Sequence, residues 1–485
     1  MSRLGNSVRY LSTRDPGRPA ATFSFEEVLL HGLAADGGLY VPQRLPQLDS
    51  AALHGLAGLA YADLAARIVG LFAGDAFSPE ELQDLATAAY RGFRHPAVAP
   101  LVQLDERLWL LELFHGPTLA FKDLALQFLG RLFDAALARR GEPVTIVGAT
   151  SGDTGAAALA ACAGCAMVDI FILYPHGRIS EVQRRQMTSL DGDNAHAIAI
   201  EGSFDDCQDL VKALFADRAF AAELHLSAIN SINWARIAAQ TVYYVAAGLA
   251  LGAPARAVSF AVPTGNFGNA YAGHLARRMG LPVARLVVAT NRNDALARYF
   301  TTGHMALAAA LPSLSPSMDI GVASNFERLL FELKEGDGAA VAAALAELRE
   351  TGTLPEDRAA ARGAQRLFSA YRLDDEGTLA SMARIHARTG ILLDPHSAIA
   401  VAAAEAAQRR ARAEADGALP MVALATAHPA KFPDAVERAT GIRPALPPAL
   451  GDLMARRERL VVLANDLGRV KSFIRARARR TRAAS

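Results

Sequence analysis

The residue in this chain best suited to covalent chemistry is Lys122, in the stretch His115-Gly-Pro-Thr-Leu-Ala-Phe-Lys-Asp123. Apolar residues follow it at helical spacing and Thr118 is a suitable N-cap, so the pattern predicts that Lys122 lies in the first turn of a helix. The positive end of the helix dipole and the nearby phenylalanines favour a neutral amine, which can attack an aldehyde to form a Schiff base. For this stretch alone, the alternative is a solvated surface lysine.

Two further stretches have the order strand, short polar loop, helix. They are Ala149-Thr-Ser-Gly-Asp-Thr-Gly155 and Pro263-Thr-Gly-Asn-Phe-Gly-Asn269. Successive backbone N–H groups at a helix N-terminus can bind an anion. In the first loop the hydroxyls of Thr150, Ser151 and Thr154 add donors, and the anion is a carboxylate or a phosphate. The alternative for the first loop is a plain capped turn.

The glycines of the second loop, Gly265 and Gly268, allow the backbone to approach an anion closely. Their spacing is neither the dinucleotide-binding pattern nor a Walker loop, and a compact monophosphate suits it better than a pyrophosphate. One phosphate together with an aldehyde that reacts with lysine describes pyridoxal phosphate. The sequence therefore predicts this cofactor, and it predicts no metal site.

Two other strand ends carry polar residues. Asn230-Ser-Ile-Asn-Trp-Ala-Arg236 follows a strand and begins a helix, so Arg236 and its neighbours could hold a second phosphate through charge-assisted hydrogen bonds. The alternative is an N-cap followed by an ion-paired arginine. Thr426 ends an apolar strand, where open α/β sheets bind ligands, and its hydroxyl could hydrogen-bond a ring nitrogen. Three histidines stand beside these motifs, each alone more often structural than catalytic: His115, His396 and His428.

The elements that position these residues alternate between strand and helix from Val144 onward, which is typical of parallel sheets covered on both faces. We expect an α/β protein with two open, mostly parallel sheet domains and a helical N-terminal extension. A nucleic-acid-binding arm is the alternative for the basic C-terminal end, which we expect to be flexible. The expected limits are 1–98 for the extension, 99–140 with 225–470 for a larger cofactor-binding domain, 141–224 for a smaller substrate domain, and 471–485 for the tail.

The composition restricts the classes of partner. The chain has 485 residues, of which 52% are hydrophobic, and a net charge of +1, so it can bury a large core and has no overall charge that would attract nucleic acid. It has no long apolar run and no secretory signal, which predicts a cytoplasmic protein without a membrane partner. Of its three cysteines, Cys162 and Cys165 form a C-x-x-C pair. We interpret this pair as small core residues, with redox or metal chemistry as the alternative.

Taken together, these stretches resemble the threonine synthase family, pyridoxal-phosphate enzymes of the tryptophan-synthase-β-like fold, and in particular its longer bacterial and fungal type. The resemblance extends from Tyr10-Leu-Ser-Thr13 to Thr426-Ala-His-Pro-Ala-Lys-Phe432. It implies that Lys122 forms the Schiff base with the cofactor and that Thr426 lies at the pyridine nitrogen. It assigns the cofactor phosphate to Gly265, Asn266, Phe267, Gly268 and Asn269.

The resemblance also implies a reaction, in which O-phospho-L-homoserine and water become L-threonine and phosphate. The γ-phosphate is eliminated, Cβ is hydrated, and the freed amine of Lys122 moves protons at Cα and Cβ. One departure is Asn269, where some relatives carry Asp; a backbone N–H contact would survive that change. The implied substrate residues are Thr150, Ser151, Gly152, Asp153 and Thr154 for the carboxylate, and Asn230, Ser231, Asn233 and Arg236 for the phosphate.

Several alternatives to this reaction remain. The nearest is a phospho-lyase of the same lineage that releases phosphate and 2-oxobutyrate. A threonine dehydratase or a cysteine-synthase-like enzyme has less need of a second phosphate site. A non-catalytic regulatory or nucleic-acid-binding protein would not require Lys122 and both glycine loops. The expected oligomeric state is a monomer or a homodimer.

Overall fold

The computed structural model of the chain describes residues 8–17, 20–228, 231–413 and 419–479. These residues form two compact units. The larger unit comprises residues 1–88, 93–115 and 231–444, and the smaller unit comprises residues 89–92, 116–230 and 445–485.

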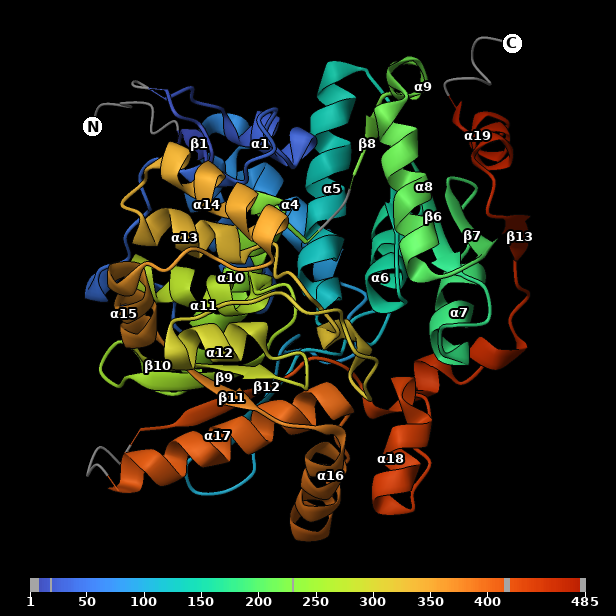
Figure 1. The fold of residues 1–485 in the computed structure, drawn as a ribbon. Coiled ribbons are helices and arrows are strands. Elements are labelled where there is room, and N and C mark those ends of the chain that lie inside the picture. The colour runs from blue at the N-terminus through green and yellow to red at the C-terminus, as the bar shows by residue number, and fades with distance from the viewer. Residues whose placement is uncertain (1–7, 18–19, 229–230, 414–418, 480–485) are drawn as a thin grey trace. The chain divides into compact units, whose positions relative to one another are not determined.

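The larger unit is built on a sheet that has six strands among the described residues, in the order β11-β10-β9-β12-β4-β3 (Figure 1). Neighbouring strands are parallel, except that β3 and β4 are antiparallel. The two central strands β9 and β12 are buried at every position, as expected of a parallel sheet covered on both faces. The strands are β3 (Leu101–Gln103), β4 (Leu108–Glu112), β9 (Val258–Pro263), β10 (Val283–Thr290), β11 (Phe368–Arg372) and β12 (Met421–Ala425).

Helices cover both faces of this sheet. Figure 1 shows α11 (Gly268–Met279) and α17 (Pro395–Ala413) on opposite sides of β9 and β10. A core of Leu, Ile, Met, Val and Ala side chains fills the space between α17 and the strands. The remaining helices of eight or more residues with most of their length in this unit are α3 (Tyr61–Ala73), α4 (Pro79–Tyr90), α10 (Trp234–Ala250), α12 (Ala295–Thr302), α13 (Phe326–Leu333), α14 (Gly338–Thr351), α15 (Arg358–Leu367), α16 (Asp375–Thr389) and α18 (Pro433–Thr440).

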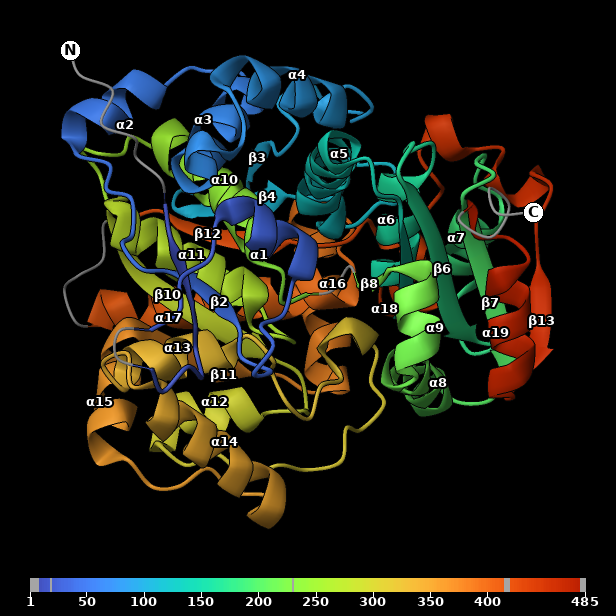
Figure 2. The ribbon, with the colours of Figure 1, turned by 90° about the horizontal axis from the view of Figure 1, so that it is seen from above.

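The smaller unit has a parallel sheet with the strand order β13-β7-β6-β5-β8 among its described residues. Figure 2 shows α6 and α7 on one side of β6 and β7, and α8 and α19 on the other. The strands are β5 (Val144–Ala149), β6 (Val168–Pro175), β7 (Ala195–Glu201), β8 (Leu226–Ser227) and β13 (Val461–Ala464). The helices are α5 (Lys122–Arg140), α6 (Asp153–Cys162), α7 (Glu181–Thr188), α8 (Phe204–Ala216), α9 (Arg218–Leu224) and α19 (Leu467–Arg475).

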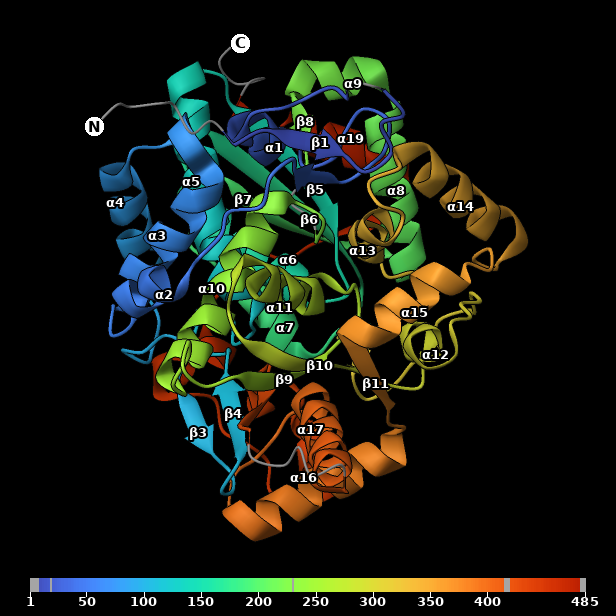
Figure 3. The ribbon, with the colours of Figure 1, turned by 90° about the vertical axis from the view of Figure 1, so that its left-hand side faces the viewer.

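The N-terminal segment packs against the larger unit's helices. Figure 3 shows α2 (Ser50–Leu56) and α3 beside α10. Strands β1 (Tyr10–Ser12) and β2 (Tyr40–Pro42) pair antiparallel, with α1 (Phe25–His31) between them in the sequence. Ser24 and Glu27 form the capping box that begins α1. A helical N-terminal extension was expected, and these elements supply it.

The predicted fold class is confirmed, but the grouping of the segments differs from the expected limits. Helix α5 groups with the smaller sheet, whereas the sequence interpretation assigned residues 99–140 to the larger domain. The physical reason is its packing on α6. A Cβ on Gly130 of α5 would lie only 2.6 Å from the carbonyl oxygen of Ala161, so glycine permits this close approach.

Residues 471–479 differ from the flexible basic tail that the sequence predicted. Val470 and Ile474 of α19 are buried in the core of the smaller unit. Lys471 Nζ lies 2.5 Å from Oδ2 of Asp217, and Arg475 Nη2 lies 2.6 Å from Oε2 of Glu223. Apolar residues at helical spacing thus outweigh the basic composition. Residues 480–485 lie outside the described part of the chain.

Two further expectations concern burial. Cys162 and Cys165 are buried, and burial raises the pKa of the Cys165 thiol to about 12, as expected of core residues rather than reactive thiols. None of the helices formed by the described residues has both the length and the apolar character needed to span a bilayer.

Candidate active site

Lys122 is the first residue of α5 and its side chain is buried, which excludes the solvated surface lysine. Its Nζ lies 3.7 Å from Oδ2 of Asp153, the first residue of α6. The other oxygen of Asp153 accepts a hydrogen bond of 2.9 Å from Nε2 of Gln183. The sequence argument for a neutral amine did not include this carboxylate. The arrangement holds a buried amine beside a fixed negative charge, where it can accept and release a proton.

Thr118 is not the N-cap of α5, so that prediction was wrong. Its hydroxyl donates to Oδ1 of Asp123 at 2.6 Å, and its backbone N–H donates to Oδ2 at 2.8 Å. The Asp123 carboxylate competes for the hydroxyl, and α5 begins only at Lys122. The predicted place of Lys122 in the first turn is nevertheless confirmed.

The first glycine loop follows β5 and is closed by its own threonine. Oγ1 of Thr150 accepts hydrogen bonds from the backbone N–H groups of Gly152 (3.0 Å) and Gly155 (2.8 Å). Gly152 has a φ of +135°, which an L side chain rarely adopts. Ser151 is exposed and Thr154 is half-buried. The loop therefore uses Thr150 to hold its shape and leaves Ser151 and Thr154 as the more accessible hydroxyls.

The second glycine loop follows β9 and leads into α11. Phe267 adopts the left-handed conformation, with φ of 63°, directly before the helix. A Cβ on Gly265 would lie 2.5 Å from the carbonyl oxygen of Ser317, so only glycine fits there. The carbonyl of Asn266 accepts hydrogen bonds from the backbone N–H and the side-chain amide of Asn325, both at 3.1 Å.

Two buried donors near this loop have no partner among the described residues. Oδ1 of Asn269 accepts the hydroxyls of Tyr243 (2.6 Å) and Tyr244 (2.8 Å), while its Nδ2 is unpaired. Nη1 of the buried Arg236 is likewise unpaired, and burial lowers the pKa of this arginine to about 10. Unsatisfied buried donors are costly, and an anion would satisfy them. The Asn269 amide fits a phosphate at the start of α11, and the Arg236 guanidinium fits a second phosphate at the start of α10.

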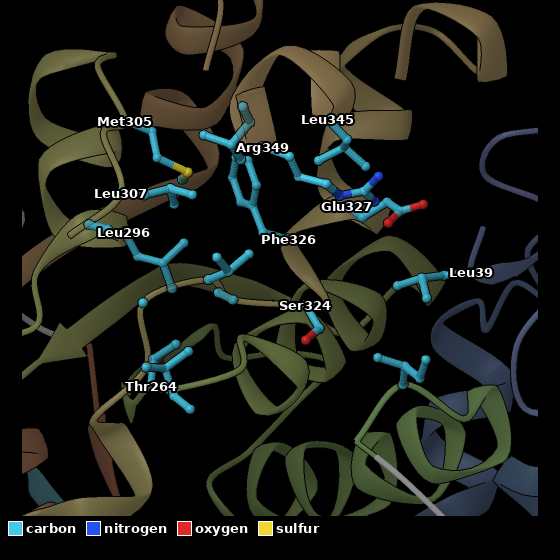
Figure 4. Close-up of a pocket in the computed structure, with 18 of the residues that line it drawn as sticks. Leu39, Thr264, Leu296, Met305, Leu307, Ser324, Phe326, Glu327, Leu345 and Arg349 are labelled. Carbon is cyan, nitrogen blue, oxygen red and sulfur yellow. The ribbon is translucent and has the colours of Figure 1, made fainter. Parts of the chain in front are cut away.

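Thr426 lies at the same edge of the larger sheet as this loop. Strands β9 and β12 are adjacent and parallel, so Thr264 and Thr426 follow their carboxyl ends side by side. A cavity of about 280 Å³ adjoins Thr264 and Gly265. Figure 4 shows that its other walls are largely apolar, with Glu327 and Arg349 on one side. The structure thus leaves free space beside the second loop.

The stretch predicted for a second phosphate is partly structural. Asn233 caps α10 by accepting the N–H of Ala235 (3.0 Å), and its amide donates to the carbonyl of Leu29 (2.8 Å). The alternative interpretation of this stretch was an N-cap followed by an ion-paired arginine. The N-cap is present, but no ion pair to Arg236 occurs among the described residues. Asn230 was also predicted here, and it lies outside the described residues.

Sequence reasoning missed a clamp formed by Asn325 and Arg328. The buried Arg328 donates to the carbonyls of Tyr40 (3.0 Å) and Ile232 (2.5 Å) and to Oδ1 of Asn325. Nδ2 of Asn325 donates to the carbonyl of Ser231 at 3.1 Å as well as to the second loop. The clamp therefore ties Ser231 to the loop. The one sign of this clamp in the sequence is Arg328 itself, because an arginine in the first turn of a helix is unfavourable with the helix dipole.

Two of the three histidines near the motifs make structural contacts. Nε2 of His115 lies 2.8 Å from Oε2 of Glu112. Nδ1 of His428 accepts the N–H of Ala430 at 3.1 Å, and burial lowers the pKa of His428 to about 4. His428 is therefore held neutral at ordinary pH, as a hydrogen-bonding residue.

Three family models match nearly the whole chain. They are described as threonine synthase N terminus (residues 9–90), pyridoxal-phosphate dependent enzyme (93–362) and threonine synthase, C-terminal (397–474). The chain belongs to the threonine synthase family. Membership confirms the resemblance found in the sequence and makes this chain a pyridoxal-phosphate-dependent lyase.

Similar proteins cover the chain almost from end to end. The threonine synthase of Pseudomonas aeruginosa is 53% identical over 468 residues, which are 96% of this chain and 98% of the relative. The pyridoxal-phosphate-bound threonine synthase from Brucella melitensis has a TM-score of 0.93 at 50% identity, covering 98% of this chain and all of that one. The yeast threonine synthase structure has a TM-score of 0.91 at 40% identity, covering 96% and 98%.

Proposed function

We propose that the chain converts O-phospho-L-homoserine and water to L-threonine and phosphate, in the cytoplasm, as a monomer or homodimer and without a nucleic-acid partner. The observation that carries the residue assignment is the buried Lys122 beside Asp153. Family membership supports the activity, and the unpaired buried donors Asn269 and Arg236 support phosphate binding.

Pyridoxal phosphate, when bound, supplies an aldehyde that reacts with a lysine amine and a ring that delocalises negative charge from Cα. Lys122 would hold it covalently. The backbone of Gly265, Asn266, Phe267 and Gly268 and the side chain of Asn269 would hold its phosphate. The hydroxyl of Thr426 would face its ring nitrogen, and a hydroxyl leaves that nitrogen largely unprotonated, which restrains side reactions such as transamination.

The chain's own residues then orient the substrate and move protons. The start of α6, with Gly152 and the hydroxyls of Ser151 and Thr154, would bind the substrate carboxylate. Lys122 Nζ would take the Cα proton and return protons during the later steps, while Gln183 holds Asp153 in place beside it. Ser231 and Arg236 would bind the substrate phosphate, and the clamp of Asn325 and Arg328 positions Ser231.

The activity is tested by incubating the purified protein with O-phospho-L-homoserine and measuring phosphate, threonine and 2-oxobutyrate together. We expect phosphate to be matched by threonine. Phosphate matched by 2-oxobutyrate would instead establish the phospho-lyase. Lys122→Ala should lower turnover by at least about a thousandfold and remove the borohydride-sensitive absorbance of the holoprotein. Retained absorbance would contradict the assignment of Lys122.

The role of Arg236 has a separate test. If the departing phosphate stays bound near Arg236 and directs water to Cβ, Arg236→Ala raises the ratio of 2-oxobutyrate to threonine. Arg349→Ala is the control, because it removes an exposed arginine of α14 that has no assigned role in phosphate binding. An unchanged product ratio in Arg236→Ala would count against the phosphate role.

A further inference from the structure

A buried carboxylate, Asp394, stands directly before α17 and accepts four hydrogen bonds from two residues, His396 and Ser397. Its Oδ1 accepts the backbone N–H of His396 (2.9 Å) and the ring Nδ1–H of His396 (2.7 Å). Its Oδ2 accepts the backbone N–H of Ser397 (3.3 Å) and the hydroxyl of Ser397. The side chains of His396 and Ser397 each accept a further hydrogen bond, from residues that lie beside the proposed cofactor site.

Ser397 connects Asp394 to Thr426. The oxygen of the Ser397 hydroxyl accepts the backbone N–H of Thr426 at 3.1 Å. Because the single hydroxyl hydrogen points to Asp394, the direction of both bonds is fixed. The carboxylate therefore determines where the end of β12 lies, and with it the side chain assigned above to the ring nitrogen.

His396 connects Asp394 to the second glycine loop. Its Nε2 accepts the backbone N–H of Ser317 at 3.3 Å, and its ring packs on Phe432 with centroids 4.9 Å apart. The carbonyl of Ser317 is the atom that a Cβ on Gly265 would meet at 2.5 Å. The backbone of residue 317 thus forms one wall of the loop assigned above to the cofactor phosphate.

We infer that Asp394 is a positioning residue that sets both ends of the cofactor site, the ring nitrogen through Ser397 and Thr426, and the phosphate through His396, Ser317 and Gly265. The inference rests on the proposed function for the roles of Thr426 and Gly265. A purely structural role predicts otherwise: Asp394 would be only the N-cap of α17, with Pro395 in the first helical position.

Three variants separate these roles. Asp394→Asn keeps an N-cap of equal preference but replaces one acceptor oxygen with a donor, so Ser397 must reverse its hydrogen bond. Ser397→Ala cuts the connection to Thr426 alone. His396→Phe cuts the connection to Ser317 alone and retains a ring against Phe432. The control is Ser381→Ala. The buried Ser381 hydroxyl, in α16, donates to the carbonyl of Ala398 in α17 (3.1 Å) and makes no hydrogen bond to Asp394, His396 or Ser397.

The measurements use the holoprotein: the dissociation constant of pyridoxal phosphate, the visible absorption band that reports the ring, and the ³¹P resonance that reports the phosphate. We expect Asp394→Asn to weaken cofactor binding about tenfold and to shift both signals. Ser397→Ala should shift the absorption band alone, and His396→Phe the ³¹P resonance alone. Ser381→Ala should leave all three unchanged.

The inference is overturned if Asp394→Asn lowers the melting temperature but leaves the dissociation constant and both signals at the Ser381→Ala values, since Asp394 would then be only a helix cap. It is also overturned if Ser397→Ala and His396→Phe shift the same signal. Wild-type protein that binds the cofactor but makes no threonine would refute the proposed activity and leave this inference standing. Wild-type protein that binds no cofactor would refute both.

Discussion

The two glycine loops have the same order of strand, polar loop and helix, yet their side chains are used differently. In the loop after β5, Thr150 accepts the backbone N–H groups of Gly152 and Gly155. In the loop after β9, the buried amide of Asn269 keeps an unpaired Nδ2 among the described residues. The first loop is satisfied internally and the second requires an acceptor. Hydroxyls and glycines in a sequence therefore locate such loops, but the hydrogen bonds decide which of them needs an anion.

The largest expected effect tests the second loop. Asn269→Leu removes the acceptor that the buried hydroxyls of Tyr243 and Tyr244 share. The Tyr243 hydroxyl then has no acceptor, and the Tyr244 hydroxyl keeps only the backbone carbonyl of residue 269, at 2.9 Å. We therefore expect the free energy of unfolding of the apoprotein to fall by about 2–4 kcal/mol in urea denaturation. Asn269→Asp keeps an acceptor and should lose less than half of that amount. Equal losses would show that the tyrosines do not depend on this acceptor.

A second pair of variants compares the loops directly. Gly265→Ala brings a Cβ against the backbone of Ser317, and Gly155→Ala brings one to 2.4 Å from Cγ2 of Thr150. Both substitutions place a methyl group where there is no room for it. We nevertheless expect only Gly265→Ala to weaken cofactor binding, by about 10–100-fold. Gly155→Ala should raise the substrate KM instead. The comparison fails if both glycines affect the cofactor dissociation constant equally.

A third prediction sharpens the role of Thr150. Thr150→Val has nearly the same shape but cannot accept the two N–H groups, so we expect about a tenfold rise in the substrate KM, with unchanged cofactor affinity. Thr150→Ser retains the acceptor and serves as the control. Steady-state kinetics with O-phospho-L-homoserine measures both. A KM in Thr150→Val equal to that of Thr150→Ser would mean that the internal hydrogen bonds do not shape the carboxylate site.

The most gradual effect concerns His428, which follows the strand end beside the second loop. Its pKa of about 4 lies below the ordinary value near 6.5, so between these values the unfolded chain binds more protons than the folded protein. The free energy of unfolding therefore falls as the pH drops from about 6.5 to 4, by up to about 1.4 kcal/mol per pH unit, and the loss levels off below 4. His428→Asn retains a cap acceptor and should remove this slope. Parallel urea-denaturation curves across pH 4–7 would contradict the prediction.

The sequence predicted most of the parallel strands and the position of Lys122, because apolar runs and helix starts are local signals. It missed β3, β4, β11 and β13, which are runs of only three to five residues. It also missed the polar residues that support the site. Arg328 meets Tyr40 and Ile232 across long separations in the chain, and Asp394 acts through Thr426 and Ser317. Such partners come together only when the chain has folded.

The larger sheet has a consequence for how the protein is made. Strand β4 pairs with β12, so residues 108–112 cannot complete their pairing in the sheet until residues 421–425 have been synthesised. At roughly 5–20 residues per second, the ribosome needs tens of seconds to synthesise that interval. Meanwhile the apolar edge of β4 is exposed in a nascent chain of high contact order. We therefore expect chaperones to bind the nascent chain during translation and to be released after β12 has emerged from the ribosome.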